Sequence, residues 1–288
     1  MVARVGFEPT NGRTKTCCLT TWRPGNDRAR FSHENQKSQR FFAFVLPRGT
    51  IASEVCSAKV KKKTVLITGA SRGIGRATAE IFTKNGFQVL GHGREHCADK
   101  IFTKFFVANF LEFSEIESMF AKIEKEFGTL DVLINNAGTV NRKKIDEFSG
   151  QDFQDLFAVN VTAPFLCARA AWRLGASAIV NVGSMRGFSQ EATTPDYSAS
   201  KAAVHNLTVS LARAFAPQCR VNCVAPGFTR TPFHDTNPER LKLEAAKTPL
   251  EKCAKAKEIA ESIFFLASEK SSFTTGATLL VDGGRNFV

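Results

Sequence analysis

Tyr197 and Lys201 are the residues of this sequence whose types and spacing most directly indicate acid–base chemistry. They are four residues apart on a predicted helix, so both side chains lie on one face. Free tyrosine has a pKa of about 10, and a neighbouring ammonium group favours the phenolate and lowers that pKa towards neutrality. Tyr197 is the only tyrosine in a chain with 26 phenylalanines, which points to its hydroxyl as the selected feature. Such a pair could donate a proton to the nascent alkoxide of a carbonyl group under reduction, although the same spacing also arises by chance on helix surfaces.

A glycine-rich turn follows the first predicted strand, in the run Thr68-Gly69-Ala70-Ser71-Arg72-Gly73-Ile74-Gly75. Glycines permit a tight turn and let the backbone approach a pyrophosphate, and the helix that follows supplies free N–H groups and the positive end of its dipole. Many glycine turns bind nothing, but this one stands between a predicted strand and a predicted helix, as in dinucleotide-binding domains. The residues expected to contact a cofactor here are Gly69, Ser71, Arg72, Gly73, Ile74 and Gly75.

The end of the second predicted strand indicates which nicotinamide cofactor would bind. Enzymes that use NAD place Asp or Glu there to hold the ribose 2′-hydroxyl, whereas this chain has His92-Gly93-Arg94. Arg94 can receive a 2′-phosphate, and Arg72 can approach it from the glycine turn. The two arginines favour NADPH over NADH. Two alternatives stay open: a small shift would put Glu95 at this place, or Arg94 is a solvated loop residue.

Together with further motifs, these features resemble the short-chain dehydrogenase/reductase family, classical type. The turn has the spacing GxxxGxG, Asn135-Asn136-Ala137-Gly138 follows the fourth predicted strand, and Val281-Asp282-Gly283-Gly284 closes the last one. The resemblance covers residues 63–284. It implies further cofactor contacts from Asn109, Phe110, Asn136, Ala137, Gly138, Tyr197, Lys201, Pro226, Gly227, Thr229 and Thr231.

The resemblance also implies a catalytic set of Asn160, Ser184, Tyr197 and Lys201. Ser184 lies thirteen residues before Tyr197, which is the spacing of the family's serine that hydrogen-bonds the substrate oxygen. Asn160 matches the asparagine that holds a water molecule for proton relay to the lysine. Tyr197 then donates the proton, and Lys201 holds the nicotinamide ribose. Taken singly, a strand-end serine and a helix asparagine are more often structural.

The family resemblance implies NADPH-dependent reduction of a ketone to a secondary alcohol. The sequence most resembles bacterial 3-oxoacyl-[acyl-carrier-protein] reductases, with a carbonyl or acyl thioester as substrate and acyl carrier protein as a potential partner. Those reductases often carry an arginine where this chain has Gln218, although Arg213 and Arg220 are close. Two alternatives remain: a sugar or polyol dehydrogenase, and a catalytically silent NADPH-binding regulator.

Two expectations concern parts beyond the motifs. Segment 228–250 follows the Pro-Gly motif and should cover the pocket as a lid, with an amphipathic stretch at 239–247. The family suggests a homotetramer, or else a dimer, built through the long helices that carry Asn160 and Tyr197.

The elements that must position these residues alternate along the chain. Short apolar runs predict buried strands at 64–67, 87–90, 105–108, 132–134, 178–182, 221–224 and 278–281. Amphipathic stretches predict helices at 73–85, 114–127 and 255–268, and Ser114 with Glu117 suggests a capping box. The alternation predicts an α/β fold, a single Rossmann-type doubly wound parallel sheet flanked by helices.

The first 60 residues differ from this pattern. Residues 1–60 lack a helical or strand period and predict a disordered N-terminal extension, whereas 61–288 form the catalytic domain. Residues 1–63 hold 13 of the 39 Lys and Arg residues but 4 of the 27 Asp and Glu residues, so most of the net charge of +12 lies there. The extension could be a transit peptide, a basic arm for RNA or membrane, or no part of the functional protein; we favour the last.

Composition limits the remaining functional classes. The eight cysteines include no CxxC pair and no Cys/His cluster with zinc spacing, which predicts no metal site and favours the cytoplasm. No run of 18 apolar residues occurs, so we expect no membrane partner. Because the basic charge is concentrated in the extension, we also expect no nucleic-acid partner for the folded part.

Overall fold

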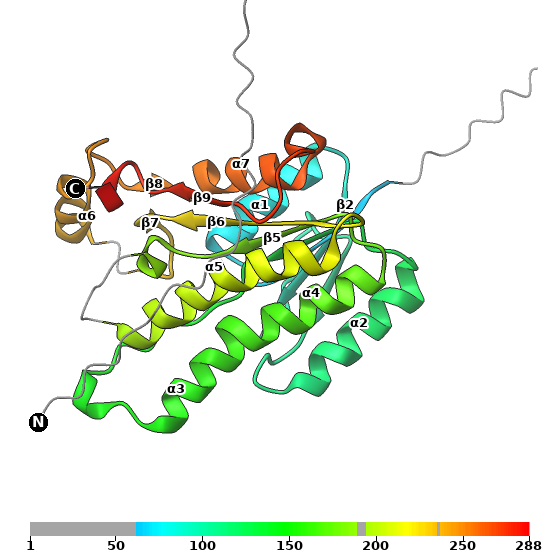
Figure 1. Ribbon diagram of the computed structural model, residues 1–288, viewed down its shortest axis with the longest axis horizontal. Coiled ribbons are helices and arrows are strands. Elements are labelled where there is room, and N and C mark those ends of the chain that lie inside the picture. Colours follow the sequence, from blue (N-terminus) through cyan, green and yellow to red (C-terminus); the bar gives the residue numbers. More distant parts are fainter. Residues whose placement is uncertain (1–61, 189–193, 235–236, 288) are drawn as a thin grey trace, which may run out of the picture. The chain divides into compact units, whose positions relative to one another are not determined.

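The computed structural model describes residues 62–188, 194–234 and 237–287 (Figure 1). The predicted extension at 1–60 lies outside these residues. Within them, seven strands form one parallel sheet, in the order β3 (Lys104–Val107), β2 (Gln88–Gly93), β1 (Thr64–Ile67), β4 (Val132–Asn135), β5 (Ala178–Val182), β6 (Arg220–Pro226) and β9 (Thr278–Val281). This order confirms the predicted doubly wound fold, because the chain starts at β1, winds outward to β3 and then returns to β4 on the other side.

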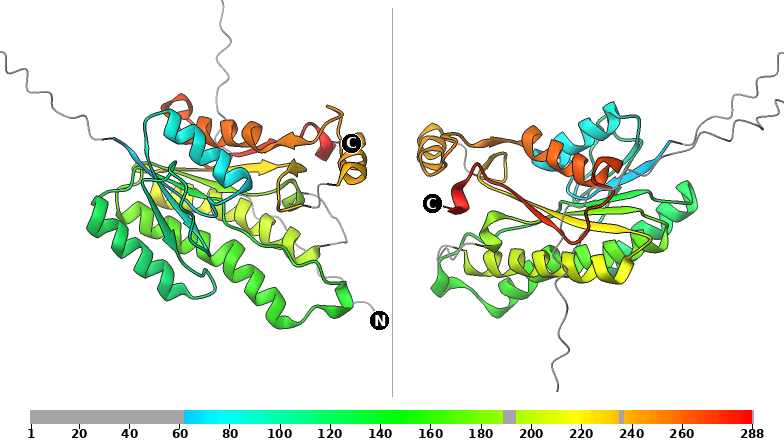
Figure 2. Two further views of the ribbon diagram at one scale, coloured as in Figure 1. Left: turned by 180° about the vertical axis from the view of Figure 1, so that it is seen from behind. Right: turned by 45° about the horizontal axis from the view of Figure 1, so that its top comes forward.

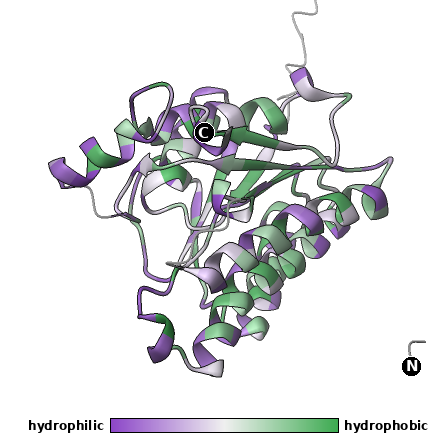
Figure 3. Cartoon of the chain, turned by 60° about the vertical axis from the view of Figure 1, so that its left-hand side comes forward, coloured by the Kyte–Doolittle hydropathy of each residue, from purple (hydrophilic) through white to green (hydrophobic). Residues whose placement is uncertain are grey.

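Helices cover both faces of the sheet. On one face lie α1 (Gly73–Lys84) and α7 (Ala256–Ala267), and on the other lie α2 (Phe113–Phe127), α4 (Ala163–Arg173) and α5 (Pro195–Phe215) (Figures 1 and 2). Each face has its own apolar cluster, so a central strand such as β1 is buried along its whole length. Figure 3 shows green, apolar strands between helices that carry purple, polar residues on their outer sides. No helix of the described part is long and apolar enough to cross a membrane.

The remaining elements lie in the connections. These are α3 (Gly150–Phe157), a π-helical turn η2 (Ala158–Thr162) that joins α3 to α4, α6 (Pro238–Ala246), and the short parallel pair β7 (Thr229–Arg230) and β8 (Ala254–Lys255), with 3-10 turns η1 (Ile145–Glu147), η3 (Met185–Gly187), η4 (Glu269–Ser271) and η5 (Arg285–Phe287). Since α3, η2 and α4 follow without a break, they form the long helix expected between the fourth and fifth strands.

Two local predictions were wrong. The first concerns α2, which begins at Phe113 with Glu112 at its N-cap, so Ser114 lies inside the first turn and forms no capping box. The second concerns β2, which continues three residues beyond the predicted end at Leu90. Gly91 and Gly93 weaken the strand pattern, but the Phe102 and Phe105 rings pack where a side chain of Gly91 would stand, and pairing with β3 extends the strand.

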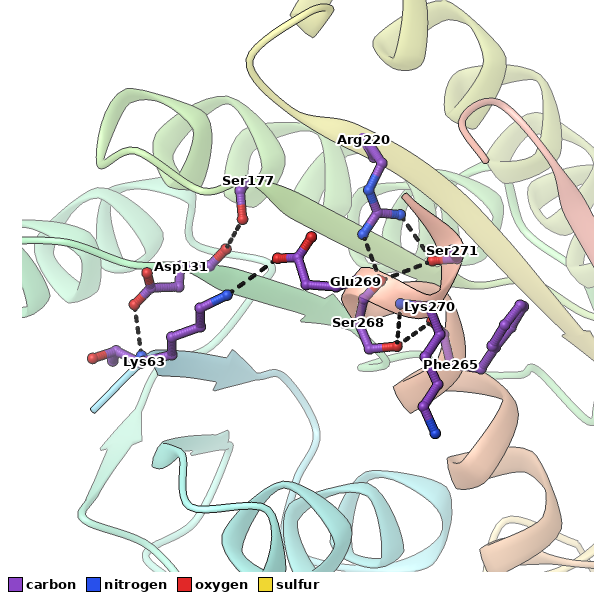
Figure 4. Close-up of polar contacts among 10 residues, drawn as sticks. Lys63, Asp131, Ser177, Arg220, Phe265, Ser268, Glu269, Lys270 and Ser271 are labelled. Carbon is purple, nitrogen blue, oxygen red and sulfur yellow. Dashed lines mark hydrogen bonds and ion pairs between the residues drawn. The ribbon is translucent and has the colours of Figure 1, made fainter. Parts of the chain in front are cut away.

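Polar contacts close the edge of the sheet where the strands begin (Figure 4). The Arg220 guanidinium donates to the carbonyl oxygens of Leu266 and Ser268, at 2.9 and 3.1 Å, and so satisfies the end of α7. The Asp131 carboxylate accepts from the Thr64 N–H at 2.7 Å. These contacts occupy the edge of the sheet at which the strands begin. In folds of this kind, ligands bind at the opposite edge, beyond the carboxyl ends of the strands.

Candidate active site

A cleft of about 1000 Å³ lies along the carboxyl ends of the strands. Its walls bring together residues from motifs that are up to 162 positions apart in the sequence, from Gly69 to Thr231. Of the predicted site residues, those that line it are Gly69, Ser71, Arg72, Gly73, Ile74, Arg94, Asn109, Phe110, Asn136, Ala137, Gly138, Ser184, Tyr197, Lys201, Pro226, Gly227, Thr229 and Thr231. Gly75 and Asn160 lie behind the wall and support it.

The glycine turn after β1 has the features of a phosphate site. Gly69 and Gly73 adopt φ of +63° and +59°, a region that other residues rarely enter. The N-terminus of α1 has neither a capping side chain nor an acidic residue in its first turn. The positive end of the helix dipole therefore faces the cleft without an anion from the described residues. This arrangement fits the pyrophosphate of a dinucleotide.

Asn136 and Gly75 hold the turn against the neighbouring strand. The Asn136 amide donates to the carbonyl oxygens of Thr68 and Gly69, at 2.9 and 3.0 Å. A Cβ on Gly75 would lie 2.6 Å from the Asn136 Nδ2 and would overlap the Gly69 carbonyl oxygen. Gly75 therefore allows α1 to pack closely on the turn, and any effect on a cofactor is indirect.

His92 is a supporting residue that the sequence analysis missed. Its Nδ1 accepts from the Gly69 N–H at 3.4 Å, and its Nε2 lies 3.0 Å from the Ala108 carbonyl oxygen. Burial lowers its pKa to about 4, so the ring is neutral near pH 7 and carries its proton on Nε2. It stacks on Phe110 at 4.1 Å between ring centroids. Since Phe110 lines the cleft, His92 joins the glycine turn to the wall beside it.

Arg94 directly follows β2, and its side chain is exposed at the rim of the cleft, as is that of Arg72. Since the strand ends at Gly93, the structure places Arg94 and not Glu95 next to the strand end. Asn109 follows β3, and its side-chain oxygen accepts from the Leu111 N–H at 3.2 Å. Its Nδ2 is thus the group that can reach a ligand.

Tyr197 and Lys201 project from the first two turns of α5 into the cleft. The Lys201 Nζ donates to the Val182 carbonyl oxygen at 2.8 Å and lies 5.7 Å from the centroid of the Tyr197 ring. Burial lowers the pKa of Lys201 to about 8. The ammonium is therefore held at the end of β5, beside the Tyr197 ring.

The expected lowering of the Tyr197 pKa was wrong for this state of the protein. Burial raises that pKa to about 12, against smaller opposing effects of a hydrogen bond with Ser184 and the charge of Arg186. At neutral pH Tyr197 is thus fully protonated, as a proton donor must be.

His205 positions Ser184 and was also missed. Its Nε2 lies 3.5 Å from the Ser184 N–H, and its ring occupies the space that a side chain at Gly183 or Gly187 would need. Burial, with a contribution from the charge of Lys201, lowers the pKa of His205 to about 4. The spacing of eight residues from Tyr197 puts His205 on the same face of α5, and this signal could have revealed it.

Asn160 lies in the π-helical turn between α3 and α4 and is 1% exposed. Its Nδ2 donates to the Thr139 carbonyl oxygen at 2.9 Å and to the Ser200 Oγ at 3.1 Å, and its Oδ1 accepts from the Thr139 N–H at 2.8 Å. These bonds tie the loop after β4 to α5. Both amide protons are used, so a water molecule can only be held through Oδ1.

The described residues of segment 228–250, the expected lid, line the end of the cleft near Tyr197. Phe233 lies 6.2 Å from Tyr197 between ring centroids, and Phe228 stacks on His234 at 4.5 Å. Glu244 of α6 forms a nearly buried ion pair with Arg285. This pair anchors α6 to the C-terminal segment, so α6 is held in place over the cleft.

Comparisons with known proteins agree with this geometry. A family model described as enoyl-(acyl carrier protein) reductase matches residues 69–286. The 3alpha-hydroxysteroid dehydrogenase of Mediterraneibacter gnavus is 35% identical over 78% of this chain and 97% of its own length. The 3-oxoacyl-[acyl-carrier-protein] reductase FabG of Vibrio cholerae is 34% identical over 77% of this chain and 96% of its own.

Solved structures are similar over the same part of the chain. The aldohexose dehydrogenase of Thermoplasma acidophilum has a TM-score of 0.74 at 30% identity and covers 79% of this chain and 95% of its own. A structure of ElxO with NADP bound has a TM-score of 0.73 at 29% identity and covers 79% of this chain and 100% of its own.

Proposed function

The chain belongs to the short-chain dehydrogenase/reductase family of oxidoreductases, and from this premise we propose that it reduces a ketone to a secondary alcohol with NADPH. The observation that carries the proposal is the convergence of Ser184, Tyr197 and Lys201 in the cleft that also contains the glycine turn. A nicotinamide cofactor, when bound, supplies the hydride. The chain's own residues orient the carbonyl group and supply the proton.

Each catalytic side chain has a role that follows from its surroundings. Tyr197, with a pKa raised to about 12, retains its proton until negative charge develops on the carbonyl oxygen. The Ser184 hydroxyl accepts from the Arg186 N–H at 3.1 Å, which leaves its own proton to be directed at the same oxygen. The Lys201 ammonium then stabilises the phenolate that remains after proton transfer.

NADPH is the cofactor that the rim of the cleft favours. Arg94 and Arg72 both line the cleft, and two guanidinium groups suit a 2′-phosphate better than a hydroxyl. The similar protein ElxO carries NADP in its structure. A carboxylate at position 94 would instead have suited the ribose of NADH.

For the substrate we propose a 3-oxoacyl thioester as the first candidate, with acyl carrier protein as its carrier. The likeness to FabG of Vibrio cholerae supports it. The likeness to an aldohexose dehydrogenase favours, as a second candidate, a sugar or polyol. A silent NADPH-binding regulator is the alternative from another class, and the complete set of Ser184, Tyr197 and Lys201 speaks against it.

The test is NADPH oxidation at 340 nm by the purified protein and by Tyr197→Phe. The substrates are acetoacetyl-CoA, a keto-sugar and an aromatic ketone, with NADH as the cofactor control. We expect turnover of at least one ketone by the wild type, and loss of turnover in Tyr197→Phe with NADPH affinity retained, because the phenyl ring keeps the shape but has no proton to donate. Equal activity of the variant would refute the role of Tyr197.

We also propose self-association through the long helices, as a homotetramer or a dimer. Phe165 and Trp172 of α4 and Val209 of α5 are large apolar residues with 37%, 37% and 38% of their surface exposed. Light scattering after gel filtration tests this, since a mass near the 31.6 kDa of one chain would refute it.

A further inference from the structure

Four basic side chains gather at the end of the cleft beside Tyr197. They are Arg142 in the loop after β4, Arg186 in η3, His234 after β7, and Arg240 in α6, and all four line the cleft. They come from three separate segments of the chain, since His234 and Arg240 both lie in segment 228–250, so no single sequence motif contains them.

Direct contacts connect this cluster to the catalytic residues. The Arg142 Nη2 donates to the carbonyl oxygen of Phe233, whose ring lies against Tyr197. The Arg186 N–H donates to the Ser184 Oγ, and the charge of Arg186 acts on both Tyr197 and His234. The cluster is therefore within electrostatic reach of a substrate held by Ser184 and Tyr197.

Arg240 has a donor without a partner. Its guanidinium carbon lies 5.9 Å from the centroid of the Phe228 ring, and its Nε is buried without a hydrogen-bond partner. A buried N–H that lacks an acceptor is unfavourable by about 1–3 kcal/mol, so this group is poised for an acceptor from outside the chain. His234 stacks beside it on Phe228, and burial together with the charges of Arg142 and Arg240 lowers its pKa to about 4.

The carboxylates along this wall already have partners. Asp152 pairs with Lys143 at 2.8 Å, and Glu244 pairs with Arg285. Asp155 accepts from the Gln151 Nε2 at 2.7 Å. Among the described residues, none of these three acids forms an ion pair with Arg142 or Arg240, so the end of the cleft favours an anion.

This cluster is separate from the arginines proposed to bind the 2′-phosphate. Arg94 follows β2, whereas His234 and Arg240 belong to the segment after β6. The two strands are four positions apart in the sheet, which at about 4.8 Å per strand is about 19 Å. One phosphate group cannot occupy both places.

We propose that Arg142, His234 and Arg240, together with the charge of Arg186, bind an anionic group of the substrate, which is therefore a ketone that carries a carboxylate or a phosphate. This inference rests on the proposed function, since it names the substrate class of the same site. The aromatic walls of Phe228 and Phe233 cover the part of the substrate between the carbonyl group and the anion.

Two matched pairs of ketones test this with the full-length protein and NADPH. The carboxylate pair is 4-oxocyclohexanecarboxylate and its methyl ester. The phosphate pair is acetoacetyl-CoA and the neutral S-acetoacetyl-N-acetylcysteamine. A charge-assisted hydrogen bond contributes about 1.5–3 kcal/mol, so we expect kcat/KM to favour the anionic member of one pair by about 10- to 100-fold. The pair that shows the preference identifies the kind of anion.

Variants then assign the preference to the cluster. In Arg240→Gln and Arg142→Gln the ratio of kcat/KM between the anionic and neutral members should fall about tenfold or more. Arg173→Gln, a matched change at an exposed arginine of α4 outside the cleft, should leave the ratio unchanged. Ratios near one in both pairs, or ratios that neither variant changes, would overturn the proposal while the ketoreductase function stands.

If none of the four ketones is reduced, that result counts against the proposed function. A binding measurement then tests the anion site by itself. Calorimetric titration with cyclohexanecarboxylate, phenyl phosphate and the neutral cyclohexanecarboxamide measures the affinity of the cluster for each ligand, and it requires no turnover. Binding of an anion but not of the amide, with loss in Arg240→Gln, supports the anion site. Equal binding of all three, or no binding of either anion, overturns it.

Discussion

Replacing Gly75 with alanine tests whether the glycine turn depends on close packing of α1. A Cβ at this position would lie 2.6 Å from the Asn136 Nδ2 and 3.0 Å from the Ala70 Cα, and it would overlap the Gly69 carbonyl oxygen. Two of these three neighbours are backbone atoms. Because backbone cannot rotate aside as a flexible side chain can, the helix or the turn must shift.

The size of the effect follows from the cost of overpacking. Extra methyl groups in a packed region destabilise by about 1–3 kcal/mol, and the backbone neighbours put Gly75→Ala at about 3 kcal/mol. A loss of 1 kcal/mol shifts the Tm of a domain of this size by about 2–4 °C, so we expect a fall of about 6–12 °C. The shift also displaces Gly69 and Asn136, both of which line the cleft, and NADPH binding should weaken at least tenfold.

Gly150→Ala is the matched control. Gly150 also lies at the start of a helix, and a Cβ there would meet nothing within 4 Å. Alanine is favoured over glycine in helices by about 0.5–1 kcal/mol, so this variant should melt at or slightly above the wild-type Tm. Thermal denaturation followed by circular dichroism and NADPH titration by fluorescence measure both effects. Wild-type Tm and wild-type NADPH affinity in Gly75→Ala would refute the packing argument.

Three further predictions concern the cofactor, the proton relay and the scaffold. Arg94→Asp should lower the ratio of kcat/KM with NADPH to that with NADH by about 10- to 100-fold, and an unchanged ratio would mean that Arg94 does not bind the phosphate. The pKa of Lys201 is lowered to about 8, while that of Tyr197 is raised to about 12. We therefore expect kcat/KM for reduction to decline as the pH rises above about 8, because the Lys201 ammonium is lost. A flat profile from pH 7 to 10 would contradict this. Arg220→Met removes the bonds to Leu266 and Ser268 at the far edge of the sheet and should destabilise by about 3 kcal/mol in urea denaturation without changing KM; a changed KM with unchanged stability would argue against a purely structural role.

Much of the fold could be predicted because its signals are local. The apolar runs at 64–67, 178–182 and 278–281 coincide with β1, β5 and β9. For β1 and β5 the apolar run reflects burial on both faces, a property that each strand carries in its own residues, whereas β9 lies at the sheet edge and is partly buried. The end of β2 could not be predicted in this way, because Gly91 and Gly93 continue the strand only through packing against Phe102 and Phe105.

The same distinction between local signals and tertiary contacts applies to the candidate site. The glycine turn and the spacing of Tyr197 and Lys201 are local patterns, and they indicated both the cofactor cleft and the residues that line it. The neutral state of His92 depends on its burial between two distant segments, which contain Gly69 and Ala108, and the raised pKa of Tyr197 likewise depends on burial in the folded chain.

The sequence by itself determined the order of strands and helices and the chemical types of the residues at their ends. The tertiary structure alone decided that Arg142 and Arg240, nearly a hundred positions apart, line one end of the cleft with His234, and that the pKa of Tyr197 lies above that of the free residue. The physical reason is that periodicity and turn chemistry act over a few residues, whereas desolvation and Coulomb interactions depend on which distant segments the sheet brings into contact.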